Sequence, residues 1–243
     1  MKHARRAFLK AAGVVPAALM VIAQPLAAPA APAAEAKLKI GIIGSGRVGG
    51  TLGEVWAKAG HDVMLSSRDI DHDRSLAAKI GANARAGSPS EAAAFGDVLM
   101  IAVPYGALPA IGKDLADILR GKVVIDTSNP IVGRDGEVAT WAREKGAGLA
   151  SAELLPGARI VRAFNAIGYA QMGKAHEQPG RVGMPIAGED DKAIALASQL
   201  VRDIGFEPVL VGGLAMGKHL MPGTPLAGER PPDEVRKIAG TLK

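Results

Sequence analysis

Three glycines have the spacing of a turn that binds a pyrophosphate. The turn reads Gly44, Ser45, Gly46, Arg47, Val48 and Gly49. In such a turn the first glycine permits the tight bend, the second lets the backbone approach the anion, and the third lets the next helix lie close to the preceding strand. The helix that follows would present free N–H groups to the phosphates. An apolar run at 37–43 precedes the turn and a helical stretch follows, so a dinucleotide site is favoured over a structural turn.

Polar residues after the second apolar run bear on the choice between NAD and NADP. Ser66, Ser67 and Arg68 stand where an NAD site usually places Asp or Glu. Hydroxyls and a guanidinium suit a 2′-phosphate, which a carboxylate would repel. Asp69 follows directly, and the alternative is that Arg68 is a solvated loop residue. The residues favour NADP, with NAD as the less favoured cofactor.

Later strands are predicted to end in residues that edge the same groove. Ala102, Val103 and Pro104 end the fourth apolar run, Asn129 follows the fifth and Asn165 follows the sixth. Ligands of open parallel sheets bind beyond the carboxyl ends of the strands. We therefore predict that all five residues contact the cofactor, the two asparagines through the nicotinamide carboxamide or the substrate pocket. An equally good interpretation is that the asparagines cap turns.

No side chain is predicted to act as a catalytic acid, base, nucleophile or metal ligand. The chain has no cysteine, and its five histidines lack metal-ligand spacing. His219, beside Lys218, could approach an acceptor pocket, although a structural role is favoured.

Apolar runs of strand length alternate with helical stretches from residue 37 onward, which predicts βαβ units. The expected strands are 37–43, 62–66, 82–86, 97–103, 122–126, 159–164, 184–187 and 208–211. The main expected helices are 71–80, 108–119, 136–145, 151–155 and 190–204, besides the helix after the glycine turn. The predicted fold is α/β, a Rossmann-type doubly wound and mostly parallel sheet. Residues 37–211 would form it, with 212–243 as a C-terminal extension of the same domain.

Residues 1–36 are predicted to be a twin-arginine signal peptide. Arg5 and Arg6 are followed by Phe-Leu and Lys, then by an uncharged stretch interrupted by prolines. Its apolar centre is shorter than the ~20 residues that span a bilayer. Small residues within 28–36 offer cleavage points. We therefore expect export by the twin-arginine machinery in the folded state, to the periplasm or the cell exterior. An uncleaved anchor or a disordered tail is the alternative.

Charge argues against a nucleic-acid partner. The formal net charge is +5, but four basic residues lie within the first ten positions. Without residues 1–34 the charge falls from +5 to +1. A nearly neutral mature chain lacks the electrostatic footprint of a nucleic-acid-binding protein.

Five segments together resemble the NADP oxidoreductases that depend on the deazaflavin coenzyme F420, and the related NADPH-linked ferric reductase domains. The segments are GIIGSGRVGGTLG, SSRD, VLMIAVP, KVVIDTSNP and LPGARIVRAFNAIG. The resemblance covers about residues 38–220. It implies hydride transfer between NADPH and a flat, flavin-like acceptor, with Ser67 and Arg68 on the 2′-phosphate and no essential acid or base. His72 stands where the family has a further basic residue, and 212–220 follows the acceptor-site pattern only in part.

The leading hypothesis is an exported NADP-dependent oxidoreductase with a flavin- or deazaflavin-type acceptor. A second hypothesis is an exported dinucleotide-binding protein with a structural or assembly role and no turnover. A third is an imine or keto-acid reductase, although only about thirty residues remain after 211 for the substrate domain of such enzymes. A homodimer could complete the pocket in that case.

Overall fold

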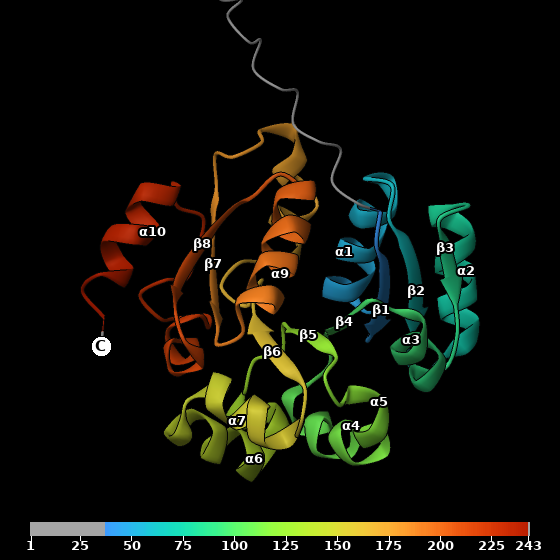
Figure 1. Cartoon of the computed structure of the whole chain (residues 1–243), viewed down its shortest axis with the longest axis horizontal. Helices are drawn as coiled ribbons and strands as arrows, with labels where there is room; N and C mark the ends of the chain where they lie inside the picture. Colours follow the sequence, from blue (N-terminus) through green and yellow to red (C-terminus); the bar gives the residue numbers. More distant parts are fainter. Residues whose placement is uncertain (1–36, 243) are drawn as a thin grey trace, which may run out of the picture. The chain divides into compact units, whose positions relative to one another are not determined.

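The computed structural model describes residues 37–242, so the predicted signal peptide lies outside the described residues. Within them eight strands form one sheet in the order β3-β2-β1-β4-β5-β6-β7-β8 (Figure 1). The strands are β1 (Lys39–Ile43), β2 (Asp62–Ser66), β3 (Ala84–Ala86), β4 (Val98–Ile101), β5 (Val123–Asp126), β6 (Arg159–Arg162), β7 (Gly183–Gly188) and β8 (Glu207–Gly212). The strands from β1 to β6 are parallel, and β7 and β8 run the opposite way. This confirms the predicted α/β, mostly parallel Rossmann fold.

Helices cover both faces of the sheet. The α-helices are α1 (Arg47–Lys58), α2 (Ile70–Ile80), α3 (Pro89–Phe95), α4 (Leu108–Asp114), α5 (Ala116–Leu119), α6 (Val132–Lys145), α7 (Ala147–Leu154), α8 (Tyr169–Met172), α9 (Asp191–Asp203) and α10 (Pro232–Ala239). Short 3-10 helices are η1 (Tyr105–Ala107), η2 (Ala175–Glu177) and η3 (Leu214–His219). One core cluster joins the sheet to α1, α2 and α9, and a second joins it to α3–α7.

The apolar runs form strands because both of their faces are buried. Every residue of β4 and of β5 is inaccessible or nearly so, as expected for central strands of a doubly wound sheet. The predicted fourth strand, 97–103, is shorter in the structure, Val98–Ile101. Ala102 still donates its N–H to the carbonyl of Ile43, but the chain then turns toward η1.

Several predicted helices have different limits in the structure. The expected helix 108–119 is divided at Leu115, whose backbone (φ −113°, ψ 15°) leaves the helical region. Helix α6 begins at Val132, before the predicted start, yet Gly136 (φ 61°, ψ −139°) interrupts it. The regular part therefore begins close to residue 136, where the sequence places it.

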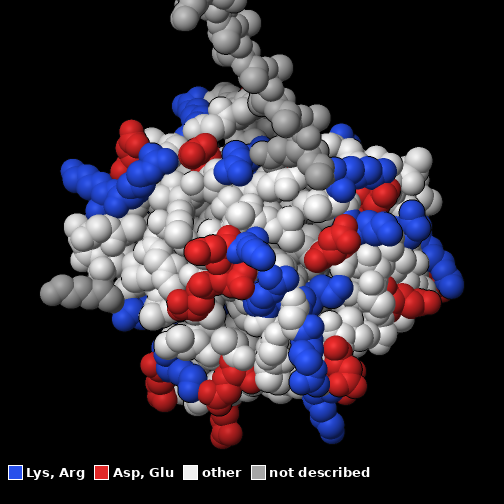
Figure 2. Space-filling view, viewed as in Figure 1, with Lys and Arg blue, Asp and Glu red and all other residues white. Residues whose placement is uncertain are grey.

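The residues after β8 pack on the far end of the sheet. A third core cluster contains Ala187, Val209, Leu220, Leu226 and Val235, which joins β7 and β8 to α10. Among the described residues, no helix is long and apolar enough to cross a membrane. Acidic and basic side chains lie interspersed on the face that Figure 2 shows.

Candidate functional site

The strand register places the predicted site residues at one edge of the sheet. Ile43 of β1 lies opposite Ser66 of β2 on one side and Ile101 of β4 on the other. Asp126 of β5 lies opposite Ile101 and Arg162 of β6. The loops that follow β1, β2, β4, β5 and β6 therefore leave the same edge. The order of strands reverses between β1 and β4, and ligands of such sheets bind beside that point.

The glycine turn follows β1 and leads into α1. Gly44 has φ 101°, and the N–H groups of Gly44 and Ser45 both donate to the carbonyl of Ser66 (2.8 and 3.2 Å). A Cβ on Gly44 would lie 2.4 Å from the Ala102 carbonyl oxygen, and one on Gly49 would lie 2.0 Å from the Gly44 carbonyl oxygen. The first and third glycines are therefore required by close backbone packing.

Gly46 differs from the other two glycines because nothing lies within 4 Å of the position of its Cβ. It is the N-cap of α1, and no side chain caps that helix. The first turn of α1 also lacks an acidic residue. In contrast, Asp69, Ser88 and Asp190 cap α2, α3 and α9. An uncapped helix N-terminus beside open space fits a pyrophosphate.

The three arginines near the turn are arranged differently. Arg68 is exposed, and its guanidinium pairs with none of the described residues. Arg74 pairs with Asp71 at 3.0 Å. Arg47 lies over the ring of Tyr169 at 5.6 Å, which brings α8 beside the start of α1. Arg68 is thus the cation at the end of β2 that remains available to a phosphate.

The serine hydroxyls near the turn point inward. Ser66 is buried and donates to the Ile42 carbonyl at 2.8 Å. Ser45 and Ser67 both donate to Asp73 of α2, whose side chain is fully buried. Sequence reasoning missed Asp73. Its four-residue spacing from buried Ala77 places both on the inner face of α2, a signal that could have found it.

The loop after β4 lies beside the glycine turn. Ala102 and Val103 are half-buried and Pro104 is exposed. The position of a Cβ on Gly44 lies 2.9 Å from Cγ1 of Val103, so these residues form the wall next to the turn.

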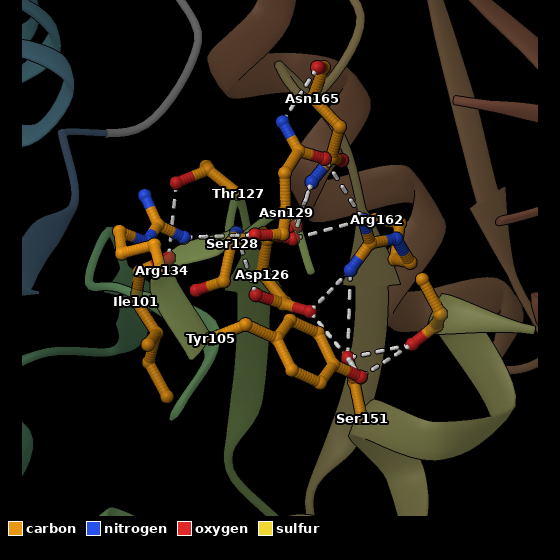
Figure 3. Close-up of polar contacts among 11 residues, drawn as sticks. Ile101, Tyr105, Asp126, Thr127, Ser128, Asn129, Arg134, Ser151, Arg162 and Asn165 are labelled. Atoms are coloured by element: carbon orange, nitrogen blue, oxygen red, sulfur yellow. Dashed lines mark hydrogen bonds and ion pairs between the residues drawn. The ribbon is translucent and has the colours of Figure 1, made fainter. Parts of the chain in front are cut away.

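A buried polar network lies behind the loops that follow β5 and β6 (Figure 3). Asp126 and Arg162 form a fully buried ion pair at 2.6 Å. Ser151 of α7 donates to Asp126 at 2.6 Å, and the Tyr105 hydroxyl donates to the Ala147 carbonyl at 3.0 Å. Burial raises the pKa of Tyr105 to about 12, despite a hydrogen bond with Ser151. The phenol is therefore a neutral structural donor near neutral pH.

Two glycines make the slot that holds the Arg162 side chain. A Cβ on Gly217 would lie 2.8 Å from Cδ of Arg162, and one on Gly148 would lie 3.2 Å from the same atom. The guanidinium donates to the Ser128 carbonyl at 3.0 Å and contacts Oδ1 of Asn129 at 3.5 Å. The buried pair thereby fixes the loop that carries Asn129.

The two predicted asparagines join the loops that follow β5 and β6. The Asn129 amide donates to the Asn165 carbonyl at 2.9 Å, and the Asn165 amide donates to the Asp126 carbonyl at 3.1 Å (Figure 3). Oγ of Ser128 and Oδ1 of Asn165 are buried without a partner among the described residues. Such atoms are costly unless a partner satisfies them. The preceding Phe164 has φ 65°, a strained backbone of the kind that clusters at functional sites.

Other features lie away from this edge. A cavity of about 430 Å³ lies beside α8 and η2, next to the residues that precede β7 and β8, and one of about 280 Å³ lies between α1 and η2. The residues predicted from the sequence line neither cavity. Among the residues that the structure describes, no three His, Asp or Glu side chains gather as a metal site. His219 ends η3 and is half-buried.

The model of one protein family, the NADP oxidoreductases dependent on coenzyme F420, matches residues 39–130. This segment contains the glycine turn, Arg68 and the loop after β4. Over this segment the chain is similar to that family. The F420-dependent NADP reductase of Methanothermobacter thermautotrophicus is 29% identical over 205 residues, which are 78% of this chain and 87% of that reductase.

Two further proteins are similar to this chain. The rat metalloreductase STEAP3 is 30% identical over 185 residues, 75% of this chain, but the chain spans only 35% of its length. The crystal structure of a hypothetical protein from Sinorhizobium meliloti has a TM-score of 0.66 and 26% identity, covering 80% of this chain and 95% of that one. The matched family model and the reductase from Methanothermobacter confirm the prediction of an NAD(P)H-dependent oxidoreductase and support a nicotinamide dinucleotide cofactor.

Proposed function

We propose that this protein transfers a hydride between NADP(H) and a flat, flavin- or deazaflavin-type acceptor. The observation that carries the proposal is the uncapped N-terminus of α1, with open space at Gly46 and the unpaired Arg68 beside it. The F420-dependent NADP reductase of Methanothermobacter, which the chain matches over most of its length, supports the same chemistry.

The end of β2 supports NADP as the preferred cofactor. NAD sites commonly carry an acidic side chain there to bind the ribose 2′-hydroxyl, whereas Ser66-Ser67-Arg68 occupies this place. The Arg68 guanidinium can form charge-assisted hydrogen bonds with a 2′-phosphate. Asp71 and its ion pair with Arg74 lie one helical turn further along.

The protein's part in the reaction is to bind and orient. A bound nicotinamide would supply or accept the hydride, and direct transfer between stacked rings needs positioning more than proton transfer. Asn129, Asn165 and Ser128 would hold the nicotinamide carboxamide or the acceptor. The unpartnered Oγ of Ser128 provides a hydroxyl for such a group, and the unpartnered Oδ1 of Asn165 provides an acceptor.

We also propose that the cofactor is loaded before export, because the twin-arginine pattern at Arg5 and Arg6 is that of proteins exported when folded. The site of action would then be the periplasm or the cell exterior.

Calorimetric titration of the purified protein with NADP⁺ and NAD⁺ tests the cofactor. We expect tighter binding of NADP⁺, and Arg68→Ala should weaken it by about 1–3 kcal/mol while changing NAD⁺ binding little, because only the 2′-phosphate loses a charged partner. Arg74→Ala is the matched control, since that guanidinium is already paired with Asp71. Equal affinities for the two dinucleotides would contradict the NADP preference.

Oxidation of bound NADPH by free flavins and by coenzyme F420 tests the acceptor. Loss of the near-ultraviolet absorbance of NADPH should depend on the acceptor. If NADPH binds but no acceptor oxidises it, a dinucleotide-binding protein without turnover becomes the better account.

A further inference from the structure

Asp73 is a buried carboxylate directly beneath the loops that would hold the adenosine end of the dinucleotide. It lies in the first turn of α2 and its side chain is fully buried. Its oxygens accept hydrogen bonds from Ser45 in the glycine turn and from Ser67 at the end of β2. Asp73 thus joins the loop proposed to bind the pyrophosphate to the loop proposed to bind the 2′-phosphate.

This arrangement fixes which way the hydroxyl protons point. A carboxylate can only accept, so Ser45 and Ser67 must both act as donors toward Asp73. Oγ of Ser67 lies 2.9 and 3.0 Å from the two carboxylate oxygens, and it accepts the N–H of Asp69 at 3.1 Å. The Asp69 carbonyl at 3.2 Å is a further, more distant acceptor, so the single proton of Ser67 is directed to the protein's own acceptors, the nearest of which is Asp73.

The direction of the Ser67 proton affects which ribose substituent, a 2′-phosphate or a 2′-hydroxyl, can bind at the end of β2. Phosphate oxygens need donors, and Ser67 in this state offers none, whereas a ribose 2′-hydroxyl can itself donate to an oxygen lone pair. The negative charge of Asp73 also opposes a dianionic phosphate more than a neutral hydroxyl. Arg68 is then the one side chain of the Ser66–Arg68 segment that favours the 2′-phosphate.

We infer that Asp73 is a specificity-determining residue that narrows the preference for NADP over NAD by holding the Ser67 hydroxyl away from the 2′-phosphate. The inference rests on the proposed dinucleotide function. It differs from a purely structural role, in which Asp73 would join the two loops without affecting the choice between the two dinucleotides.

Asp73→Asn tests the inference with little change in shape. The amide oxygen can still accept from one serine, while the amide N–H₂ donates to the other and releases a hydroxyl proton. We expect NADP⁺ to bind about ten-fold more tightly, the gain of one hydrogen bond to a charged group, with NAD⁺ affinity changed about two-fold or less. Asp71→Asn is the matched control, since it removes the same charge from an exposed position of the same helix.

Ser67→Ala supplies a second measurement that does not require Asp73 to be replaced. In the native background it should change NADP⁺ affinity by about two-fold or less, because its proton is already committed. Combined with Asp73→Asn, it should abolish most of the ten-fold gain, so the double-mutant cycle reports the coupling. The ratio of dissociation constants for NADP⁺ and NAD⁺ is the readout, with thermal unfolding as the check on folding.

The outcomes separate this inference from the proposed function. If the native protein binds neither dinucleotide, the proposed function is wrong. If both bind, but Asp73→Asn leaves their ratio unchanged or Asp71→Asn changes it equally, Asp73 does not set specificity. A ten-fold loss of NADP⁺ affinity in Ser67→Ala alone would also overturn the inference, since the hydroxyl would then reach the phosphate despite Asp73.

Discussion

At the residue scale, Gly46 and Gly49 occupy the same turn but tolerate a methyl group differently. The space around the Gly46 Cβ position is open for 4 Å, and its backbone is extended. A Cβ on Gly49 would lie 2.0 Å from the Gly44 carbonyl oxygen, well inside any real contact. Gly46 therefore leaves room for a ligand, whereas Gly49 leaves room for the protein's own backbone.

Gly46→Ala and Gly49→Ala form a matched pair that separates binding from folding. Gly46→Ala should keep the free energy of unfolding within about 1 kcal/mol of the native value, yet weaken NADP⁺ binding by about ten-fold or more, because the methyl group occupies the phosphate's approach. Gly49→Ala should lower the free energy of unfolding by about 1–3 kcal/mol or more through overpacking. Urea unfolding and calorimetric titration measure the two effects. Unchanged affinity in Gly46→Ala would place the pyrophosphate elsewhere.

At the scale of elements, one polar network holds together the strands and helices behind the proposed nicotinamide end of the site. Asp126 ends β5, Arg162 ends β6, Ser151 belongs to α7 and Tyr105 begins η1 (Figure 3). Both members of the ion pair are fully buried, so removal of either one would leave an uncompensated charge, at a cost of about 3–5 kcal/mol. The loops of Asn129 and Asn165 are positioned by this network.

The network also predicts a pH dependence of stability. Burial raises the pKa of Tyr105 from 10.0 to about 12. Its contribution to stability is complete below pH 10 and is lost as the pH rises toward 12, because the unfolded chain ionises first. The loss should reach roughly 3 kcal/mol. Urea unfolding between about pH 9 and 12 should show this loss in the native protein, and Tyr105→Phe should remove that part of the slope. Parallel profiles for the two proteins would contradict the assignment.

At the scale of the whole molecule, the doubly wound order of strands creates the site. Strands β1, β2, β4, β5 and β6 are parallel, so their five following loops meet at one edge. The site is thus complete only when the whole sheet has formed. The proposed loading of the cofactor before export therefore requires that the sheet folds in the cytoplasm.

Cell fractionation tests that proposal on the full chain. Arg5→Lys combined with Arg6→Lys should leave the protein in the cytoplasm, because the twin-arginine route reads the arginine pair rather than its charge. Lys2→Arg, an equally conservative change outside the pair, should leave export unaffected. Export of the double variant at the native level would show that the pair is not read.

The sequence by itself determined in which order strands and helices follow one another along the chain, and where the glycine turn lies. Those signals are local. An unbroken apolar run such as 98–101 predicts a strand buried on both faces, and Gly44 and Gly49 stand where a Cβ would collide with nearby backbone carbonyls. The similarity to the F420-dependent NADP oxidoreductases rests on the same local segments.

Only the tertiary structure decided which polar groups meet. Asp126 and Arg162 are 36 positions apart, and Ser45 and Asp73 are 28 apart, so no local pattern links them. The reversal of β7 against β6 likewise depends on the path of the chain between Arg162 and Ala187, which pair across the sheet. Burial then assigns the Ser67 hydroxyl to Asp73, whereas the sequence alone assigns Ser67 to the 2′-phosphate.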